Sequence, residues 1–196
     1  AALGQPLAIV SQQPQTTRET LLGVVTTPEA QLAFIDTPGL HRPKTELGRR
    51  MNNVAQASLR DADLALFITD VFAMKSALGD APESKNGDDD VSLIERIPDD
   101  LPTVVAINKI DKVRRKEELL PFMEALNRRR SFQATVPISA LKGDGVPLVL
   151  AALVELLPEG PAHFDADTLT DRPLSYFARE YVREQICQIT SQEVPH

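Results

Sequence analysis

The stretch Asp36-Thr37-Pro38-Gly39 follows the apolar run Leu32-Ala33-Phe34-Ile35. An apolar run of strand length that ends in Asp and then Gly places a carboxylate and a backbone N–H at the carboxyl edge of a sheet, where open α/β folds bind ligands. In phosphate chemistry the Asp36 carboxylate would hold Mg²⁺, usually through water, and the Gly39 N–H would donate to the terminal phosphoryl oxygens. Taken alone the stretch also fits an ordinary turn, because Asp, Pro and Gly are the commonest turn residues.

Two later apolar runs also end in polar loops. The run 103–107 ends in Asn108-Lys109-Ile110-Asp111, and the run 134–138 ends in Ser139-Ala140-Leu141. A carboxylate such as that of Asp111 can accept from both the N1–H and the exocyclic amine of guanine, whereas adenine offers no such pair on that edge. The stem of Lys109 can cover the purine face, Asn108 can tie neighbouring loops together, and the N–H of Ala140 can donate to guanine O6. In this order after strands, the motifs predict a guanine-reading site.

The remaining periodicities predict a three-layer α/β domain with mostly parallel strands and one antiparallel edge hairpin. The hairpin pairs 21–26 with 31–35 around a short turn at 27–30. Helical spacing of Leu47, Met51, Val54 and Ser58 predicts a helix before a buried strand at 64–70. Further helices are expected around 119–126, over 146–157, and after Asp171, which can cap the last one.

Composition limits the classes of partner. The 196 residues carry a formal net charge of −7, so most of the surface is unsuited to a polyanion, which needs clustered Lys and Arg. Two local basic clusters, at 112–116 and 128–130, could touch RNA, although the helix macrodipole explains the second equally well. Cys187 is the single cysteine, which excludes an internal disulfide and fits a reducing compartment.

Three segments together resemble the bacterial Era-like GTPases. They are 11–18, which contains Pro14-Gln15-Thr16-Thr17-Arg18, then 36–41, and Asn108 to Asp111. Gln15 favours this family, because related GTPases with tandem G domains typically carry Gly there. The resemblance implies a P-loop NTPase-type G domain that binds GTP, hydrolyses it to GDP and acts as a switch in small ribosomal subunit (30S) assembly and rRNA maturation.

The resemblance also assigns roles to individual residues. Thr17 and Asp36 would hold Mg²⁺, and Thr17 and Gly39 would serve catalysis. The residues expected to bind GTP or GDP are Asp36, Thr37, Pro38, Gly39, Leu40, Asn108, Lys109, Ile110, Asp111, Ser139, Ala140 and Leu141. The implied partners are guanine nucleotide, small-subunit ribosomal RNA and the 30S precursor, with no DNA. The implied location is the cytoplasm, with peripheral association at the inner face of the cell membrane.

One departure concerns the phosphate-binding loop Gly-x-x-x-x-Gly-Lys-Ser, which the sequence lacks. The backbone nest and the Lys that cradle phosphates are therefore missing from these residues. We expect an internal fragment of a longer protein, in which 1–158 is a G domain without its first strand and P-loop. In that interpretation 159–170 is a linker, and 171–196 is the first helix of a KH-type RNA-binding domain.

Two alternatives remain open at this stage. A pseudo-GTPase that has lost its phosphate loop would work as a scaffold for protein or RNA, without nucleotide. Another ribosome-assembly GTPase of the same superfamily would carry a second G domain in the full gene.

Overall fold

The computed structural model describes residues 20–37, 46–72 and 93–190. By its internal contacts the chain divides into two compact units. Of the described residues, those within Leu59–Glu159 form one unit, and those within Leu3–Ser58 and Gly160–His196 form the other.

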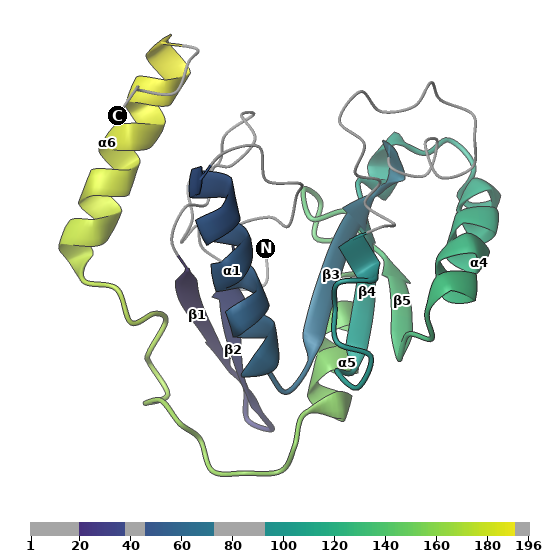
Figure 1. Ribbon diagram of the computed structural model, residues 1–196, viewed down its shortest axis with the longest axis horizontal. Helices are drawn as coiled ribbons and strands as arrows, with labels where there is room; N and C mark the ends of the chain where they lie inside the picture. The colour runs from purple at the N-terminus through teal and green to yellow at the C-terminus, as the bar shows by residue number, and fades with distance from the viewer. Residues whose placement is uncertain (1–19, 38–45, 73–92, 191–196) are drawn as a thin grey trace. The chain divides into compact units, whose positions relative to one another are not determined.

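The first unit is built around β4 (Thr103–Asn108), the central strand of a parallel sheet in the order β3-β4-β5 (Figure 1). Its sequence Thr-Val-Val-Ala-Ile-Asn is rich in β-branched residues, and every residue before Asn108 is buried. A continuous apolar run of this kind is typical of a parallel strand covered on both faces. The neighbours are β3 (Ala65–Asp70) and β5 (Ala134–Pro137).

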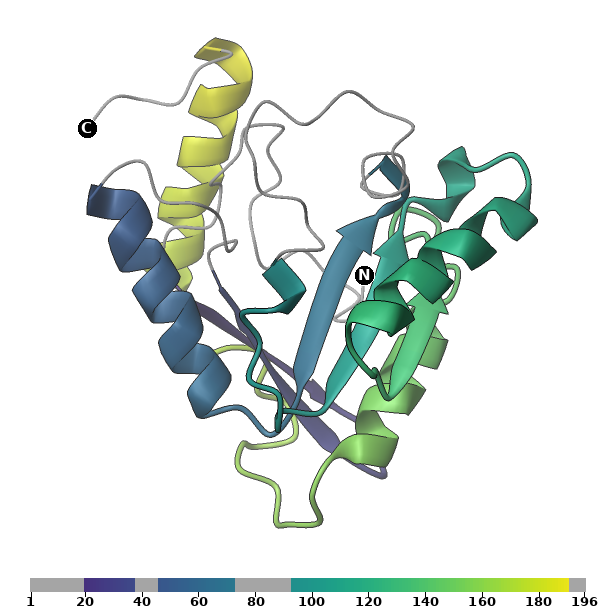
Figure 2. The same ribbon diagram turned by 45° about the vertical axis from the view of Figure 1, so that its right-hand side comes forward.

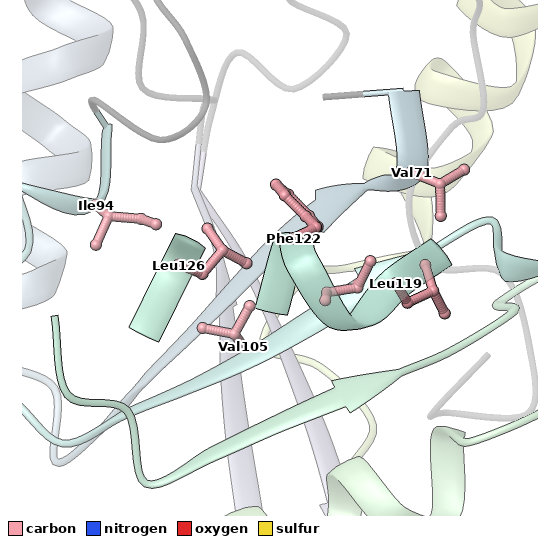
Figure 3. Close-up of a cluster of buried hydrophobic side chains, with 7 residues drawn as sticks. Val71, Ile94, Val105, Leu119, Phe122 and Leu126 are labelled. Atoms are coloured by element: carbon pink, nitrogen blue, oxygen red, sulfur yellow. The ribbon is translucent and has the colours of Figure 1, made fainter. Parts of the chain in front are cut away.

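Two helices sandwich this sheet. Figure 2 shows α4 (Leu119–Arg129) in front of the strands and α5 (Val146–Leu156) behind them. Leu119, Phe122 and Leu126 of α4 pack against Val105 of β4 in the main hydrophobic cluster (Figure 3). This burial confirms the predicted apolar face of α4, and within this unit the predicted three layers are present.

The predicted strand at 64–70 forms, but it is not fully buried. The side chain of Ile68 in β3 is 58% exposed, and β3 is an edge strand among the described residues. An edge strand lacks a neighbour on one side, so part of its apolar surface stays open. Both β3 and β4 nevertheless end together, because Asp70 is in register with Asn108.

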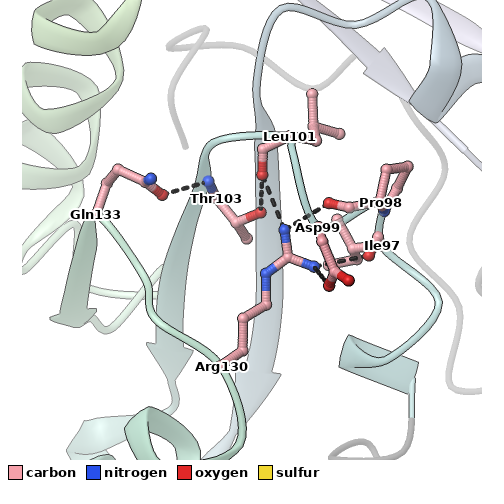
Figure 4. Close-up of polar contacts among 7 residues, drawn as sticks. All are labelled: Ile97, Pro98, Asp99, Leu101, Thr103, Arg130 and Gln133. Atoms are coloured by element: carbon pink, nitrogen blue, oxygen red, sulfur yellow. Dashed lines mark hydrogen bonds and ion pairs between the residues drawn. The ribbon is translucent and has the colours of Figure 1, made fainter.

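Arg130 holds the segment that leads into β4. Its guanidinium donates to the carbonyl oxygens of Ile97, Pro98 and Leu101 at 2.6, 2.6 and 2.9 Å (Figure 4). The side chain is only 11% exposed. Arg130 is thus a structural residue, which removes it from the predicted basic surface at 128–130.

The other two arginines of that cluster form exposed ion pairs. Arg128 pairs with Glu124 at 3.5 Å, and Arg129 pairs with Glu95 at 3.4 Å.

The second unit contains the predicted hairpin, made of β1 (Leu21–Thr26) and β2 (Gln31–Asp36). The strands pair antiparallel, from Leu21 opposite Asp36 to Thr26 opposite Gln31. The turn is closed by Thr27, whose backbone N–H donates to the Ala30 carbonyl at 2.8 Å. The hairpin forms a two-stranded sheet of its own among the described residues.

The segment that precedes α6 (Leu174–Thr190) is fastened to this hairpin. Gln31 donates to the Phe164 carbonyl at 2.9 Å, and its side-chain oxygen accepts from the N–H groups of His163 and Phe164. The Val24 N–H donates to the Leu169 carbonyl at 2.9 Å. These hydrogen bonds hold part of the predicted linker, residues 163–169, against the hairpin, and we call this segment the strap.

The predicted helix at 47–58 forms as α1 (Glu46–Arg60), in which Asn52 and Ala55 are buried and Val54 is 42% exposed. The prediction for the last helix needs correction. Helix α6 begins at Leu174, so Asp171 lies too far upstream to cap it. Pro173 directly precedes the first helical residue, and its carbonyl accepts from the Tyr176 N–H at 2.9 Å. None of the described helices is long and apolar enough to span a membrane.

Candidate guanine-reading site

The loop after β4 is a tight turn whose shape depends on Lys109. This residue has φ 65° and ψ 30°, the left-handed conformation that side-chain-bearing residues seldom adopt. The turn is closed by the Lys112 N–H, which donates to the Lys109 carbonyl at 2.9 Å, and it continues as the short 3-10 helix Ile110–Lys112. Such an unusual backbone conformation persists only where its surroundings hold it in place.

Asn108 supplies part of that support. Its side-chain oxygen accepts from the N–H of Lys109 at 2.7 Å and from the N–H of Ala140 at 3.0 Å. The two loops are also joined by the Ile110 N–H, which donates to the Ile138 carbonyl at 3.1 Å. Asn108 therefore ties the loops after β4 and β5 together, as predicted.

The same contact qualifies the predicted role of Ala140. Its N–H already donates to Asn108, so guanine O6 would have to share that N–H in a three-centre hydrogen bond.

Asp111 is positioned by Ser139. The Ser139 hydroxyl donates to Oδ1 of Asp111 at 2.8 Å. This hydrogen bond is the main reason that the pKa of the Asp111 carboxyl lies below its usual value, with Lys112 and Lys142 lowering it further and desolvation opposing the shift. A carboxylate has acceptor sites for more than one donor, so the bond to Ser139 leaves Asp111 able to accept from a ligand.

Ser139 itself is held inside a compact loop. It is fully buried, its N–H donates to the Asp144 carbonyl at 2.9 Å, and its carbonyl accepts from the Gly143 N–H at 2.8 Å. Gly143 and Gly145 both have positive φ. A Cβ at Gly145 would lie 2.5 Å from the Pro137 carbonyl oxygen, so that position requires glycine.

Two side chains stand at the open surface of the cluster. Lys109 has a side chain that is 49% exposed, and Leu141 is 84% exposed. The large apolar side chain of Leu141 is left uncovered by the described part of the chain. Its position suits the edge of a planar ligand held by the loops.

The residues predicted for the phosphate end are only partly described. Asp36 is the last residue of β2, is exposed, and is followed by Thr37. Thr17, Pro38, Gly39 and Leu40 lie outside the described residues, so their predicted roles stay predictions.

The chemistry of Asp36 fits the implied Mg²⁺. A carboxylate oxygen is a hard ligand, and Mg²⁺ usually keeps several waters and takes only one or two protein carboxylates beside phosphate oxygens. Within the described ranges no three His, Cys, Asp or Glu side chains gather as a metal cluster. The assignment of Mg²⁺ to Asp36 rests on the family resemblance and stays a prediction.

The described geometry brings seven predicted residues together, namely Asn108, Lys109, Ile110, Asp111, Ser139, Ala140 and Leu141. They provide a fixed carboxylate, a fixed N–H and a long aliphatic stem, which together match the edge and face of guanine. Residues 1–109, more than half of the chain, match the family described as 50S ribosome-binding GTPases. The chain belongs to this GTPase family.

Relatives within this GTPase family include proteins named GTPase Era. Those of Ruminiclostridium cellulolyticum and Xylella fastidiosa (strain Temecula1) are each 40% identical to this chain, over 98% and 100% of its length. The chain spans 61% and 62% of those two proteins. The predicted resemblance to Era-like GTPases is confirmed.

Solved structures agree with this placement. Era in complex with MgGDPNP and a fragment of 16S ribosomal RNA has a TM-score of 0.84 at 36% identity, covering 99% of this chain and 63% of that one. A variant of Aquifex aeolicus Era bound to GDP·AlF4⁻ has a TM-score of 0.85, with the same identity and coverage. The predicted P-loop NTPase-type fold is confirmed by these neighbours.

Sequence reasoning missed three residues around the cluster. Asp70 and Phe72, at the end of β3, contact Lys109. The signal for Asp70 was its place as the polar residue at the end of a third parallel strand, at the same edge as Asn108. Gly145 could have been found from the Gly-Asp-Gly turn after Ser139.

Proposed function

We propose that the chain is the nucleotide-binding part of a GTPase that hydrolyses GTP to GDP and acts as a switch in small ribosomal subunit assembly. The observation that carries the proposal is the pair of loops in which Ser139 holds Asp111 and Asn108 holds Ala140. A fixed carboxylate that accepts two donors favours guanine, because adenine presents no matching pair of N–H groups.

Each residue has a defined part in this activity. Asp111 accepts from the guanine edge, Lys109 covers the purine face, and Asn108 keeps the two loops at a fixed separation. Mg²⁺ bound at Asp36 would neutralise phosphate charge in hydrolysis. Thr17 and Gly39 are proposed, from the family resemblance, to contact the metal and the terminal phosphate.

The test is a titration of the full-length gene product with mant-GDP, with and without Mg²⁺, followed by competition with GTP, ATP and XTP. We expect competition by GTP and none by ATP. Asp111→Asn replaces an acceptor oxygen by an amide that donates to the C2 carbonyl of xanthine, so it should lower GTP affinity and raise XTP affinity, each by about a hundredfold.

Asp63→Asn is the matched control, because Asp63 is exposed and precedes the opposite end of β3. It should leave both affinities unchanged. A protein that binds no guanine nucleotide, or an Asp111→Asn variant with unaltered base preference, would favour the nucleotide-free scaffold.

We further propose that the full-length protein binds small-subunit ribosomal RNA and the 30S precursor. Support comes from Era, whose solved complex contains MgGDPNP and nucleotides 1506–1542 of 16S ribosomal RNA. Binding of a labelled 16S 3′ fragment in the presence of GDPNP or GDP tests this proposal, and equal, salt-sensitive binding of any RNA of that length would contradict it. The predicted KH domain, cytoplasmic location and peripheral membrane association stay predictions, and cell fractionation tests the last two.

A further inference from the structure

Two side chains from the end of β3 hold the ammonium group of Lys109. Nζ of Lys109 lies 2.5 Å from Oδ2 of Asp70. The same Nζ lies 5.2 Å from the centroid of the Phe72 ring, within the range of a cation–π contact. The cation of the guanine-reading loop is therefore held by Asp70, the last residue of β3, and by Phe72, two residues further along the chain.

Asp70 is itself well placed for this contact. It is in parallel register with Asn108, so it ends the neighbouring strand beside the loop that carries Lys109. Its other carboxylate oxygen, Oδ1, accepts from the N–H of Phe72 at 2.9 Å. Val71 between them is buried in the main hydrophobic cluster, which anchors the short segment that presents both contacts.

The backbone of Lys109 is fixed, but its side chain has four rotatable bonds. The Asn108 side chain accepts from the Lys109 N–H, and the residue has a left-handed conformation. A half-exposed lysine stem loses conformational entropy when it is ordered. Holding the ammonium group before the ligand arrives removes part of that loss from the binding step.

We propose that Asp70, assisted by Phe72, is a positioning residue for guanine nucleotide, acting through Lys109. With its backbone held by Asn108 and its ammonium held by Asp70, the aliphatic stem of Lys109 is stretched between two fixed ends. That stem is the part of the side chain that covers the purine face. The inference rests on the proposed function, since it concerns the same ligand.

A double-mutant cycle in the full-length gene product tests the proposal. Asp70→Asn keeps the size of the side chain and removes its charge, and it should raise the mant-GDP Kd about three- to fivefold, the upper range for a partly exposed ion pair. Lys109→Met keeps the stem and removes the ammonium. In the Lys109→Met background, Asp70→Asn should change the Kd by less than about 1.3-fold, because the two residues act as one unit.

Further variants separate positioning from folding. Asp70→Glu retains the charge and should recover at least half of the lost affinity, and Asp63→Asn should have no effect. Phe72→Leu removes the cation–π contact and should raise the Kd about twofold, again only when Lys109 is present. If Asp70→Asn does not fold, the same double-mutant cycle can be measured with Phe72→Leu and Lys109→Met.

Three results would overturn the inference. Unchanged or tighter mant-GDP binding by Asp70→Asn would show that the pair does not prepare the site. An equal loss in the Lys109→Met background would show that Asp70 acts by another route. With either of these results the wild-type protein still binds GDP, so the proposed function stands. The third result, a wild-type protein that binds no GDP, would overturn both the inference and the proposed function.

Discussion

The Ser139 hydroxyl donates a 2.8 Å hydrogen bond to Oδ1 of Asp111, across two loops that follow different strands. It is the largest cause of the lowered Asp111 pKa. Because the folded-state pKa lies below the unfolded value near 3.8, the contact stabilises the protein above that pH. The stabilisation is lost as the pH falls through the lowered pKa.

Ser139→Ala should therefore raise the Asp111 pKa toward 3.8 and shift the acid loss of GDP binding to higher pH. At neutral pH the carboxylate stays charged but is less well oriented, so we expect the GDP Kd to rise about fivefold. Carboxyl-carbon NMR titration of Asp111 and mant-GDP titrations at several pH values measure the two effects. Ser131→Ala, at an exposed serine before β5, is the control, and an unchanged Asp111 titration would contradict the assignment.

Gly145→Ala should destabilise the loop that presents Ser139. A Cβ there would lie 2.5 Å from a backbone oxygen and 3.0 Å from Cγ2 of Ile138, in a conformation that already disfavours alanine, so we expect a loss of about 3 kcal/mol in unfolding free energy. Gly143→Ala is the matched control, because Gly143 also has positive φ but has nothing within 4 Å of its added Cβ. It should cost about 1 kcal/mol. Urea denaturation measures both, and equal losses would disprove the role of crowding.

Arg130→Met should lower the free energy of unfolding by about 2–3 kcal/mol, since buried carbonyl oxygens lose charged donors. Arg128→Met removes only an exposed ion pair with Glu124 and should cost less than about 0.5 kcal/mol. Thermal unfolding of the two variants compares them directly. A similar small effect for both would mean that Arg130 belongs to the surface after all.

Gln31→Ala should loosen the strap at residues 163–164. The Gln31 side chain accepts from both amides of this pair, so we expect the hydrogen-exchange protection of His163 and Phe164 to fall about tenfold. Gln56→Ala, at an exposed position on α1, should leave those amides unchanged. Full retention of protection in Gln31→Ala would show that the strap is held by other contacts.

The predictable part of the fold was the part governed by local pattern. The hairpin at 21–36 and the strand at 103–108 follow from apolar runs of strand length, and the helix at 119–129 follows from helical apolar spacing. All three form close to their expected bounds. The helix predicted from the spacing of Leu47, Met51, Val54 and Ser58 forms as α1, but spacing alone did not indicate that Asn52 and Ala55 would be buried, because tertiary contacts decide which side chains are covered.

The site residues that lie in short sequence motifs could be predicted, but the contacts between residues far apart in the sequence could not. Asn108 and Asp111 could be identified from their order after a strand. The contacts of Asp70 with Lys109, and of Arg130 with Ile97, join residues 39 and 33 positions apart. No local pattern specifies such pairs, because strand register and loop path bring them together.

Every described residue of the guanine-reading cluster belongs to the unit Leu59–Glu159, which has a hydrophobic core of its own. The carboxylate expected to serve the metal belongs to a different stretch, Leu3–Ser58. If the proposed function holds, base recognition and metal binding would therefore be encoded in separate lengths of the chain. A substitution near Asp36 could then alter hydrolysis and leave the preference for guanine unchanged.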